Sequence, residues 1–126
     1  VSGEAVSVTA ARRAASVDRL FLAYFLRDPD PIGRSWWASL HAAGRPLTAI
    51  SLEFARSAEF AARYGQLTDT DFVRLVYGNV LQRDPDALGL AYWTGMLAQG
   101  RTRGWVMVGF SESPEFVSRT GTTPPR

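Results

Sequence analysis

The feature that most constrains the fold of this chain is an internal repeat with a period of 56 residues. Residues 27–37 read RDPDPIGRSWW and residues 83–93 read RDPDALGLAYW, so the pattern RDPD-x-x-G-x-x-x-W occurs twice. Of the 39 positions between residues 27 and 65, 15 are identical to the residue 56 positions later. Because each copy of such a repeat is one structural unit, the sequence predicts one unit used twice.

Each copy predicts four helices. The first helix carries apolar residues at the spacing of an amphipathic helix. These residues are Val17, Leu20, Phe21, Tyr24 and Phe25 in the first copy, and Val73, Val76, Tyr77, Val80 and Leu81 in the second. We expect Thr9 to cap this helix in the first copy and Thr68 to cap it in the second, where Asp71 completes a capping box.

The second helix of each copy follows the repeated pattern. A proline ends the helix before it, and Asp30 and Asp86 are typical N-caps of the next helix. Its apolar members are Ile32, Trp36, Trp37 and Leu40, matched by Leu88, Tyr92, Trp93 and Met96. Gly44 and Gly100 are predicted to end it in the left-handed conformation.

The third helix is expected to start at Pro46 or Thr102, and a short fourth helix at Ser57 or Ser113. No stretch shows the alternation of a strand. The sequence therefore predicts an all-α fold in which two tandem four-helix repeats, about residues 15–65 and 68–121, pack into one compact domain over residues 1–126. Residues 1–8 and 122–126 are expected to be flexible arms.

Composition excludes several classes of function. The chain has no cysteine, which excludes disulfides and thiolate metal sites, and it has no apolar run of the roughly 20 residues that a membrane helix needs. All 14 basic residues are arginine, and the net charge is only +2 because 12 acidic residues are interspersed with them. Nucleic-acid-binding proteins show a clustered basic face. We therefore expect neither nucleic-acid binding nor membrane insertion.

The two aspartate-rich turns resemble the start of a calcium-binding loop. Such a loop also needs oxygen ligands at its fifth and twelfth positions. The chain has Ile32 and Leu88 at the fifth position, and Ser39 and Gly95 at the twelfth. A turn followed by a helix cap accounts for the same aspartates. We expect no metal and no cofactor, and weak calcium binding is the alternative.

The spacing that repeats between the two copies also predicts an ion pair in each copy. Arg27 and Arg83 open the repeated pattern, and Glu59 and Glu115 lie in the fourth helix. A planar guanidinium that grips a carboxylate would tie the turn to the rest of its unit. The structural motif then comprises Arg27, Asp28, Asp30, Gly33, Trp37 and Glu59 in the first copy, and Arg83, Asp84, Asp86, Gly89, Trp93 and Glu115 in the second. The alternative is an anion or sugar site around Arg27 and Asp28.

Two tryptophans are candidate ligand-binding residues. Adjacent helix residues point about 100° apart, so Trp36 and Trp37 cannot both face one core direction. Either their helix is sandwiched between neighbours or one ring is partly exposed. Trp105 has Ala49 as its counterpart, so it is free of the repeated core pattern. Trp36 and Trp105 could therefore stack on a sugar, with Arg27 and Asp28 as polar partners.

Catalysis has little support. His41 is the only histidine, and its counterpart is Leu97. No nucleophile elbow and no glycine-rich phosphate loop is present. The sequence predicts a protein that is not an enzyme.

The second copy carries a resemblance to a known family. Residues 72–93 read FVRLVYGNVLQRDPDALGLAYW, and the pattern continues through Gly100, Arg103, Phe110, Ser113, Glu115 and Phe116. This resembles a bacterial all-helical repeat domain family of uncharacterised function, found in secreted and cell-surface proteins, and is similar to the linker domains of phycobilisomes. The first copy departs from the pattern at Ala23 and Trp36, where the second has Asn79 and Tyr92.

The resemblance implies a non-catalytic module at an extracellular or cell-surface location, with no binding residues to transfer. We expect an interaction or scaffolding module of an exported bacterial protein that binds a protein partner or a neighbouring domain. The alternative is a module that binds carbohydrate or cell-envelope glycan through exposed aromatic rings.

Overall fold

Helices account for all the regular structure in the part of the chain that the structure describes. The computed structural model describes the backbone of residues 2–120 and the side chains of residues 14–120. The elements are α1 (Ser2–Phe25), α2 (Pro31–Ala42), α3 (Leu47–Ala55), α4 (Ala58–Tyr64), α5 (Asp69–Val76), the π-helical turn η1 (Tyr77–Leu81), α6 (Ala87–Ala98), α7 (Arg103–Ser111) and α8 (Pro114–Thr120). The predicted all-α class is confirmed over these residues.

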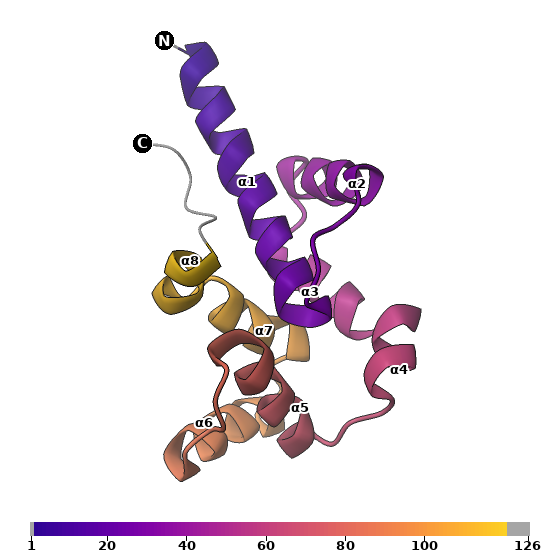
Figure 1. Cartoon of the computed structure of the whole chain (residues 1–126), viewed down its shortest axis with the longest axis vertical. Helices are drawn as coiled ribbons and strands as arrows, with labels where there is room; N and C mark the ends of the chain where they lie inside the picture. The colour runs from indigo at the N-terminus through magenta and orange to yellow at the C-terminus, as the bar shows by residue number, and fades with distance from the viewer. Residues whose placement is uncertain (1, 121–126) are drawn as a thin grey trace.

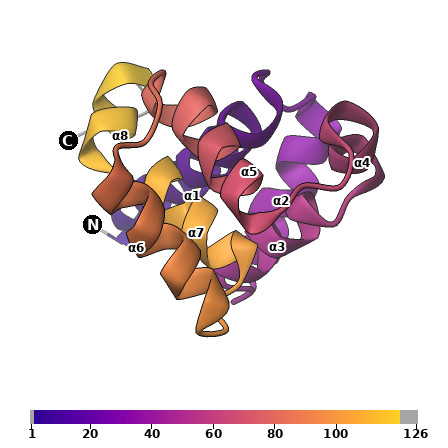
Figure 2. The same cartoon turned by 90° about the horizontal axis from the view of Figure 1, so that it is seen from below.

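The helices surround a central pair. α3 and α7 make the most extensive contact of any two elements, and α1 packs on both. α2 and α4 lie on one side of this centre, and α6 and α8 lie on the other, in both views (Figures 1 and 2). α1 packs against α2, and α5 packs against α6.

Two predictions about the first helix of each copy need correction. α1 begins at Ser2, so Thr9 lies inside the helix and does not cap it. Residues 4–25 contain no proline or glycine and are rich in alanine, so no residue near Thr9 interrupts the helix. In the second copy the helix changes to π geometry at Tyr77, which the sequence pattern does not predict. Residues 1 and 121–126, including the expected C-terminal arm, lie outside the described residues.

The predicted caps other than Thr9 form as expected. Thr68 accepts a hydrogen bond from the N–H of Asp71 at 3.1 Å, and Thr102 accepts one from Trp105 at 3.0 Å. Gly44 and Gly100 follow the last turns of α2 and α6. Their φ values are 110° and 101°, a backbone conformation that residues with a Cβ rarely adopt. Local signals therefore fix most of the helix ends.

The core is formed by the predicted face of the first helix together with aromatic residues of α3 and the short helices. Phe54 of α3 packs edge to face on Phe21 and Trp37, with ring centroids 4.7 and 5.0 Å away. In the second half, Phe110 contacts Tyr77 and Trp93 at 5.0 and 4.8 Å. The fully buried side chains include Val17, Leu20, Tyr24, Ile50, Phe72, Val73, Val76, Val80, Val106 and Met107.

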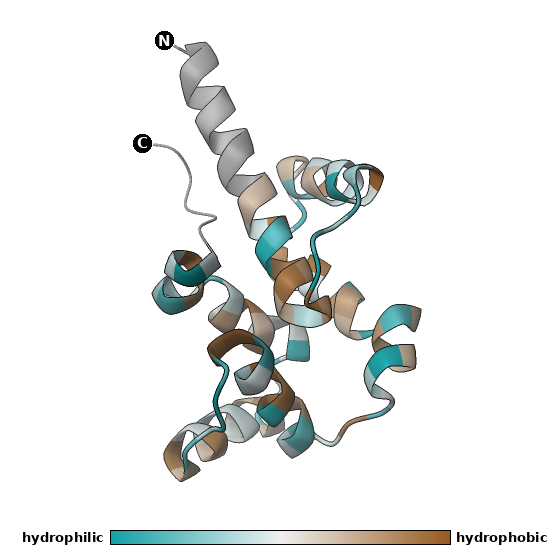
Figure 3. Ribbon diagram, viewed as in Figure 1, coloured by the Kyte–Doolittle hydropathy of each residue, from teal (hydrophilic) through white to brown (hydrophobic). Residues whose placement is uncertain are grey.

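α2 and α6 are covered on one side only, and neither contains a fully buried residue. Ile32 and Leu88, which the sequence pattern assigns to the apolar faces of these helices, are 83% and 85% exposed. The first turn of each of these helices therefore turns its apolar residue outward. Figure 3 shows hydrophobic colour along α6 at the edge of the molecule.

Candidate functional site

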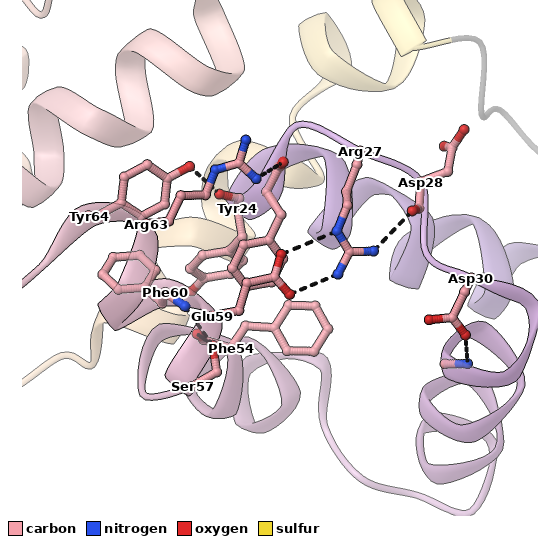
Figure 4. Close-up of polar contacts among 12 residues, drawn as sticks. Tyr24, Arg27, Asp28, Asp30, Phe54, Ser57, Glu59, Phe60, Arg63 and Tyr64 are labelled. Atoms are coloured by element: carbon pink, nitrogen blue, oxygen red, sulfur yellow. Dashed lines mark hydrogen bonds and ion pairs between the residues drawn. The ribbon is translucent and has the colours of Figure 1, made fainter.

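The repeated turn is built around an aspartate cap. The Asp30 carboxylate accepts a hydrogen bond from the N–H of Gly33 at 2.7 Å, and Asp86 accepts one from Gly89 at 2.6 Å (Figure 4 shows the first of these). Just before each turn the backbone adopts a positive φ of 56° at Leu26 and 57° at Gln82. These two positions have the same offset of 56 residues, so both turns leave their helix in the same way.

The predicted arginine–glutamate pair forms in both copies. Arg27 Nη2 and Nε lie 2.8 and 3.2 Å from the two carboxylate oxygens of Glu59 (Figure 4). Arg83 Nη1 lies 3.2 Å from the nearer oxygen of Glu115. The hydrogen bond to Glu59 raises the pKa of Arg27 above its usual value. All four side chains are about half exposed, so each pair contributes about 1 kcal/mol or less.

This geometry bears on the alternative ligand set of Arg27 and Asp28. The Arg27 guanidinium donates hydrogen bonds to Glu59 and, at 3.2 Å, to the carbonyl oxygen of Asp28. It also lies over the ring of Phe21. In Figure 4 the carboxylate of Asp28 points away from that guanidinium. Arg27 and Asp28 therefore do not converge on a common ligand position.

The aspartates of the two turns serve as helix caps. Among the described residues, no group of three or more histidine, cysteine, aspartate or glutamate side chains is placed to hold a metal ion. Asp30 and Asp86 already accept the backbone N–H of their helix. His41 is half-buried, and its Nδ1 lies 2.9 Å from the carbonyl oxygen of Arg45, where it closes the end of α2.

A third set of contacts escaped sequence reasoning. Arg63 of α4 donates to the carbonyl oxygen of Phe25, and Arg119 of α8 donates to that of Val80. Each arginine thus satisfies a carbonyl at the end of the first helix of its own half. The recurrence of Arg63 at position 119 was the signal that could have found this contact.

The tryptophans divide into core and surface rings. Trp36 is 59% exposed whereas its neighbour Trp37 is half-buried, which confirms that one ring of the pair faces outward. Trp105 is half-buried, packs on Trp93 at 5.9 Å, and carries the guanidinium of Arg101 at 4.8 Å over its ring. Trp36 therefore offers an open ring face, and Trp105 has its ring occupied.

α2 and α6, on opposite sides of the central helices, each expose large apolar side chains. Ile32 and Trp36 lie one helical turn apart on α2, and Leu88 and Tyr92 lie one turn apart on α6. Trp36 and Tyr92 are 59% and 53% exposed. The two pairs are related by the same 56-residue offset, so both halves expose an aliphatic and an aromatic side chain at matching positions. We call these two pairs the outer apolar pairs.

The cap assignment gives a first prediction. The change Asp86→Ala is expected to lower the free energy of unfolding by about 1 kcal/mol, because the N–H of Gly89 loses its acceptor. Calcium is expected to leave the melting temperature unchanged. Urea denaturation and thermal melting, each with calcium or with a chelator, measure both effects.

Asp84→Ala is the matched control, because the Asp84 side chain is exposed and makes no hydrogen bond or ion pair in the described part of the chain. Its stability is expected to stay within about 0.5 kcal/mol of the parent. A calcium-dependent rise in melting temperature that Asp86→Ala abolishes would contradict the cap assignment.

Comparisons with known proteins bear on the family. A family model described as a domain of unknown function, DUF4214, matches residues 51–120, which is more than half of the chain. No curated protein and no solved structure gives a significant match. Within the described residues, no helix combines the length and the apolar character needed to cross a bilayer. Because the family model matches more than half of the chain, the chain belongs to the DUF4214 family.

Proposed function

We propose that this domain is a non-catalytic interaction module that binds a protein partner or a neighbouring domain through the outer apolar pairs. The observation that supports this proposal most is the exposure of Ile32 and Leu88, at 83% and 85%, beside exposed aromatic rings. Clustered apolar side chains on a protein surface mark interaction sites. Aromatic residues are also enriched at the centres of protein interfaces.

The sequence of α6 favours the same reading. Its 12 residues include no charged side chain. A helix that is apolar all round is normally covered on all sides, yet Leu88 and Tyr92 of α6 face outward. Partner binding would cover this face. We further propose that the module acts outside the cytoplasm of a bacterium, a location that rests on the resemblance described above.

We also infer that the two halves are one unit used twice and related by a pseudo-twofold axis. Asn79 Nδ2 donates to the carbonyl oxygen of Ala23 at 2.9 Å, and these positions are counterparts. Gly104 lies against the backbone of its own counterpart, Thr48. Counterparts meet in this way at the centre of an isologous, twofold-related interface. An experimental structure in which a simple translation relates the halves would contradict this inference.

A test of the proposed function places a photo-crosslinking amino acid at position 88 or 92 of the protein in its native host. Crosslinks to peptide are expected from both positions, with the partner segment identified by mass spectrometry. Position 62, exposed on α4, is the control and is expected to give none. Equal yields from all three positions, or none from 88 and 92, would count against the proposal.

Substitution separates binding from stability. The double change Leu88→Ser and Tyr92→Ser is expected to reduce partner binding at least about tenfold, because interface hot spots contribute about 2 kcal/mol or more. Because both side chains are exposed, unfolding is expected to shift by about 0.5 kcal/mol or less for each. A variant that keeps full binding would remove the α6 pair, Leu88 and Tyr92, from the interface.

Glycan binding is the second candidate, and the open ring of Trp36 favours it. Titration of tryptophan fluorescence with envelope glycans tests it, with Trp36→Leu as the variant. A saturable change with one glycan class, lost in Trp36→Leu, would establish a lectin-like module instead. A flat response from folded protein would leave protein binding as the function.

A further inference from the structure

A groove runs across the surface where the two halves of the chain meet. It consists of two adjoining hollows of about 410 and 420 Å³, both lined by Ala55, Arg56 and Arg103. The C-terminal end of α3 supplies one wall, and the N-terminal ends of α5 and α7 supply the other. The groove is separate from the outer apolar pairs, whose side chains do not line it.

The groove carries excess positive charge. Arg56, Arg101 and Arg103 line it, and Asp69 is the carboxylate among its lining residues. Asp69 is neutralised, because Arg103 Nη2 donates to it at 2.9 Å and to the carbonyl oxygen of Leu67 at 2.7 Å. Arg56 and Arg101 are not matched by a further acid. The net charge of these side chains is therefore about +2.

Two of these guanidinium groups are available to a ligand. Within the described residues, the Arg56 side chain makes no hydrogen bond or ion pair. Arg101 contacts the ring of Trp105 and makes no hydrogen bond or ion pair with the described residues, which leaves its N–H donors unused there. Other arginines differ, since Arg19, Arg27, Arg34, Arg45 and Arg83 each pair with a carboxylate.

The surroundings reinforce this charge. Arg103 lies over the ring of Phe72 at 5.1 Å, and its two polar contacts fix it in place. The first turn of α7 has no acidic residue, so the positive end of its dipole is not offset. The counterpart of Arg56 is Glu112, which Arg19 binds, so at this repeat position only the first copy carries a cation.

The apolar lining indicates the class of ligand. Leu52 and Leu97 lie beside the arginines in one hollow, and Leu67 lies in the other. A sugar would need an open aromatic face, whereas Phe60 is 4% exposed and is the one aromatic residue lining either hollow. Arginine binds carboxylates well, and leucines beside it can contact apolar side chains. This combination matches the chemistry of an acidic peptide.

We propose that this groove binds an acidic peptide segment of the protein partner, with glutamate or aspartate side chains on Arg56 and Arg101 and apolar side chains on the leucines. This inference rests on the proposed function, because it assumes a protein partner, but it uses a different surface. Experiments can therefore contradict the proposal for the groove without contradicting the proposal for the outer apolar pairs, and the reverse.

Fluorescence polarisation of the 126-residue chain with a short fluorescein-labelled peptide tests the groove. The peptide alternates glutamate with alanine and leucine, and a second peptide has glutamine at every glutamate position. Saturable binding of the glutamate peptide is expected, together with weaker binding at higher ionic strength. The combined change Arg56→Gln and Arg101→Gln is expected to weaken that binding at least about tenfold.

Arg74→Gln is the matched control, because Arg74 is exposed, unpaired within the described residues and absent from the groove lining. It is expected to change binding less than about twofold. Equal binding of the glutamine peptide, an equal loss in Arg74→Gln, or no saturable binding would overturn the proposal. Binding of an oligogalacturonate or of inorganic phosphate in place of the peptide would also overturn it. Thermal melting verifies that each variant is folded.

Discussion

Gly104→Ala is expected to destabilise the fold by about 3 kcal/mol, at the upper end of the cost of overpacking a core. A Cβ at position 104 would lie 2.5 Å from both the N atom of Leu52 and the carbonyl oxygen of Thr48. Both are backbone atoms of α3, so no side chain can rotate to make room. The central helices would have to separate, which loosens the packing of Ile50 and Met107 between them.

Chemical denaturation at equilibrium measures this effect, and the melting temperature is expected to fall on the order of 10 °C. Gly95→Ala is the matched control. Gly95 is also a helical glycine, but a Cβ there meets nothing within 4 Å. That change is expected to raise stability by about 0.5–1 kcal/mol, because alanine favours the helix. If both variants were equally stable, the close contact between α3 and α7 would be refuted.

The contrast between these glycines shows what sequence reasoning reached and what it missed. Gly44 and Gly100 were predictable because a helix end needs a left-handed residue at a fixed local position. No local sequence signal marks Gly104. A glycine is required there because the backbone of α3, more than 50 residues earlier in the chain, leaves no room for a Cβ. Local signals therefore fixed the helices, and long-range contacts fixed their packing.

The same division applies to the candidate site. Asp86 and the Arg27–Glu59 pair were predicted because their spacing repeats. Contacts made where the copies differ were not predicted, such as the bond from Asn79 to the carbonyl of Ala23. Periodicity also placed Leu88 on an apolar stripe, although a helix at the edge of the fold is covered over only part of that stripe.

Arg19 and Glu112 form an ion pair that breaks the repeat and joins α1 to the end of α7. Arg19 is 5% exposed, and its Nε and Nη2 lie 2.7 and 2.6 Å from one oxygen of Glu112. Nη2 also donates to Ser16 at 3.1 Å. Removing the carboxylate deletes the Glu112 partner of a buried guanidinium, which is costly in a low-dielectric setting.

Glu112→Ala is accordingly expected to lower the free energy of unfolding by about 2–3 kcal/mol. The estimate lies below the usual cost of breaking a buried pair, because the Glu112 side chain is 27% exposed. Glu53→Ala is the control, since it breaks the exposed pair with Arg45 and is expected to cost less than about 1 kcal/mol.

Two further measurements distinguish the lost charge from lost packing. The effect of Glu112→Ala is expected to persist in concentrated salt, because a buried pair is weakly screened, whereas the smaller effect of Glu53→Ala is expected to vanish. The double change Arg19→Met and Glu112→Leu is expected to recover most of the stability, since apolar residues can replace a buried pair at little cost. A double variant no more stable than Glu112→Ala would show that the cost comes from packing, and not from the loss of the Arg19–Glu112 ion pair.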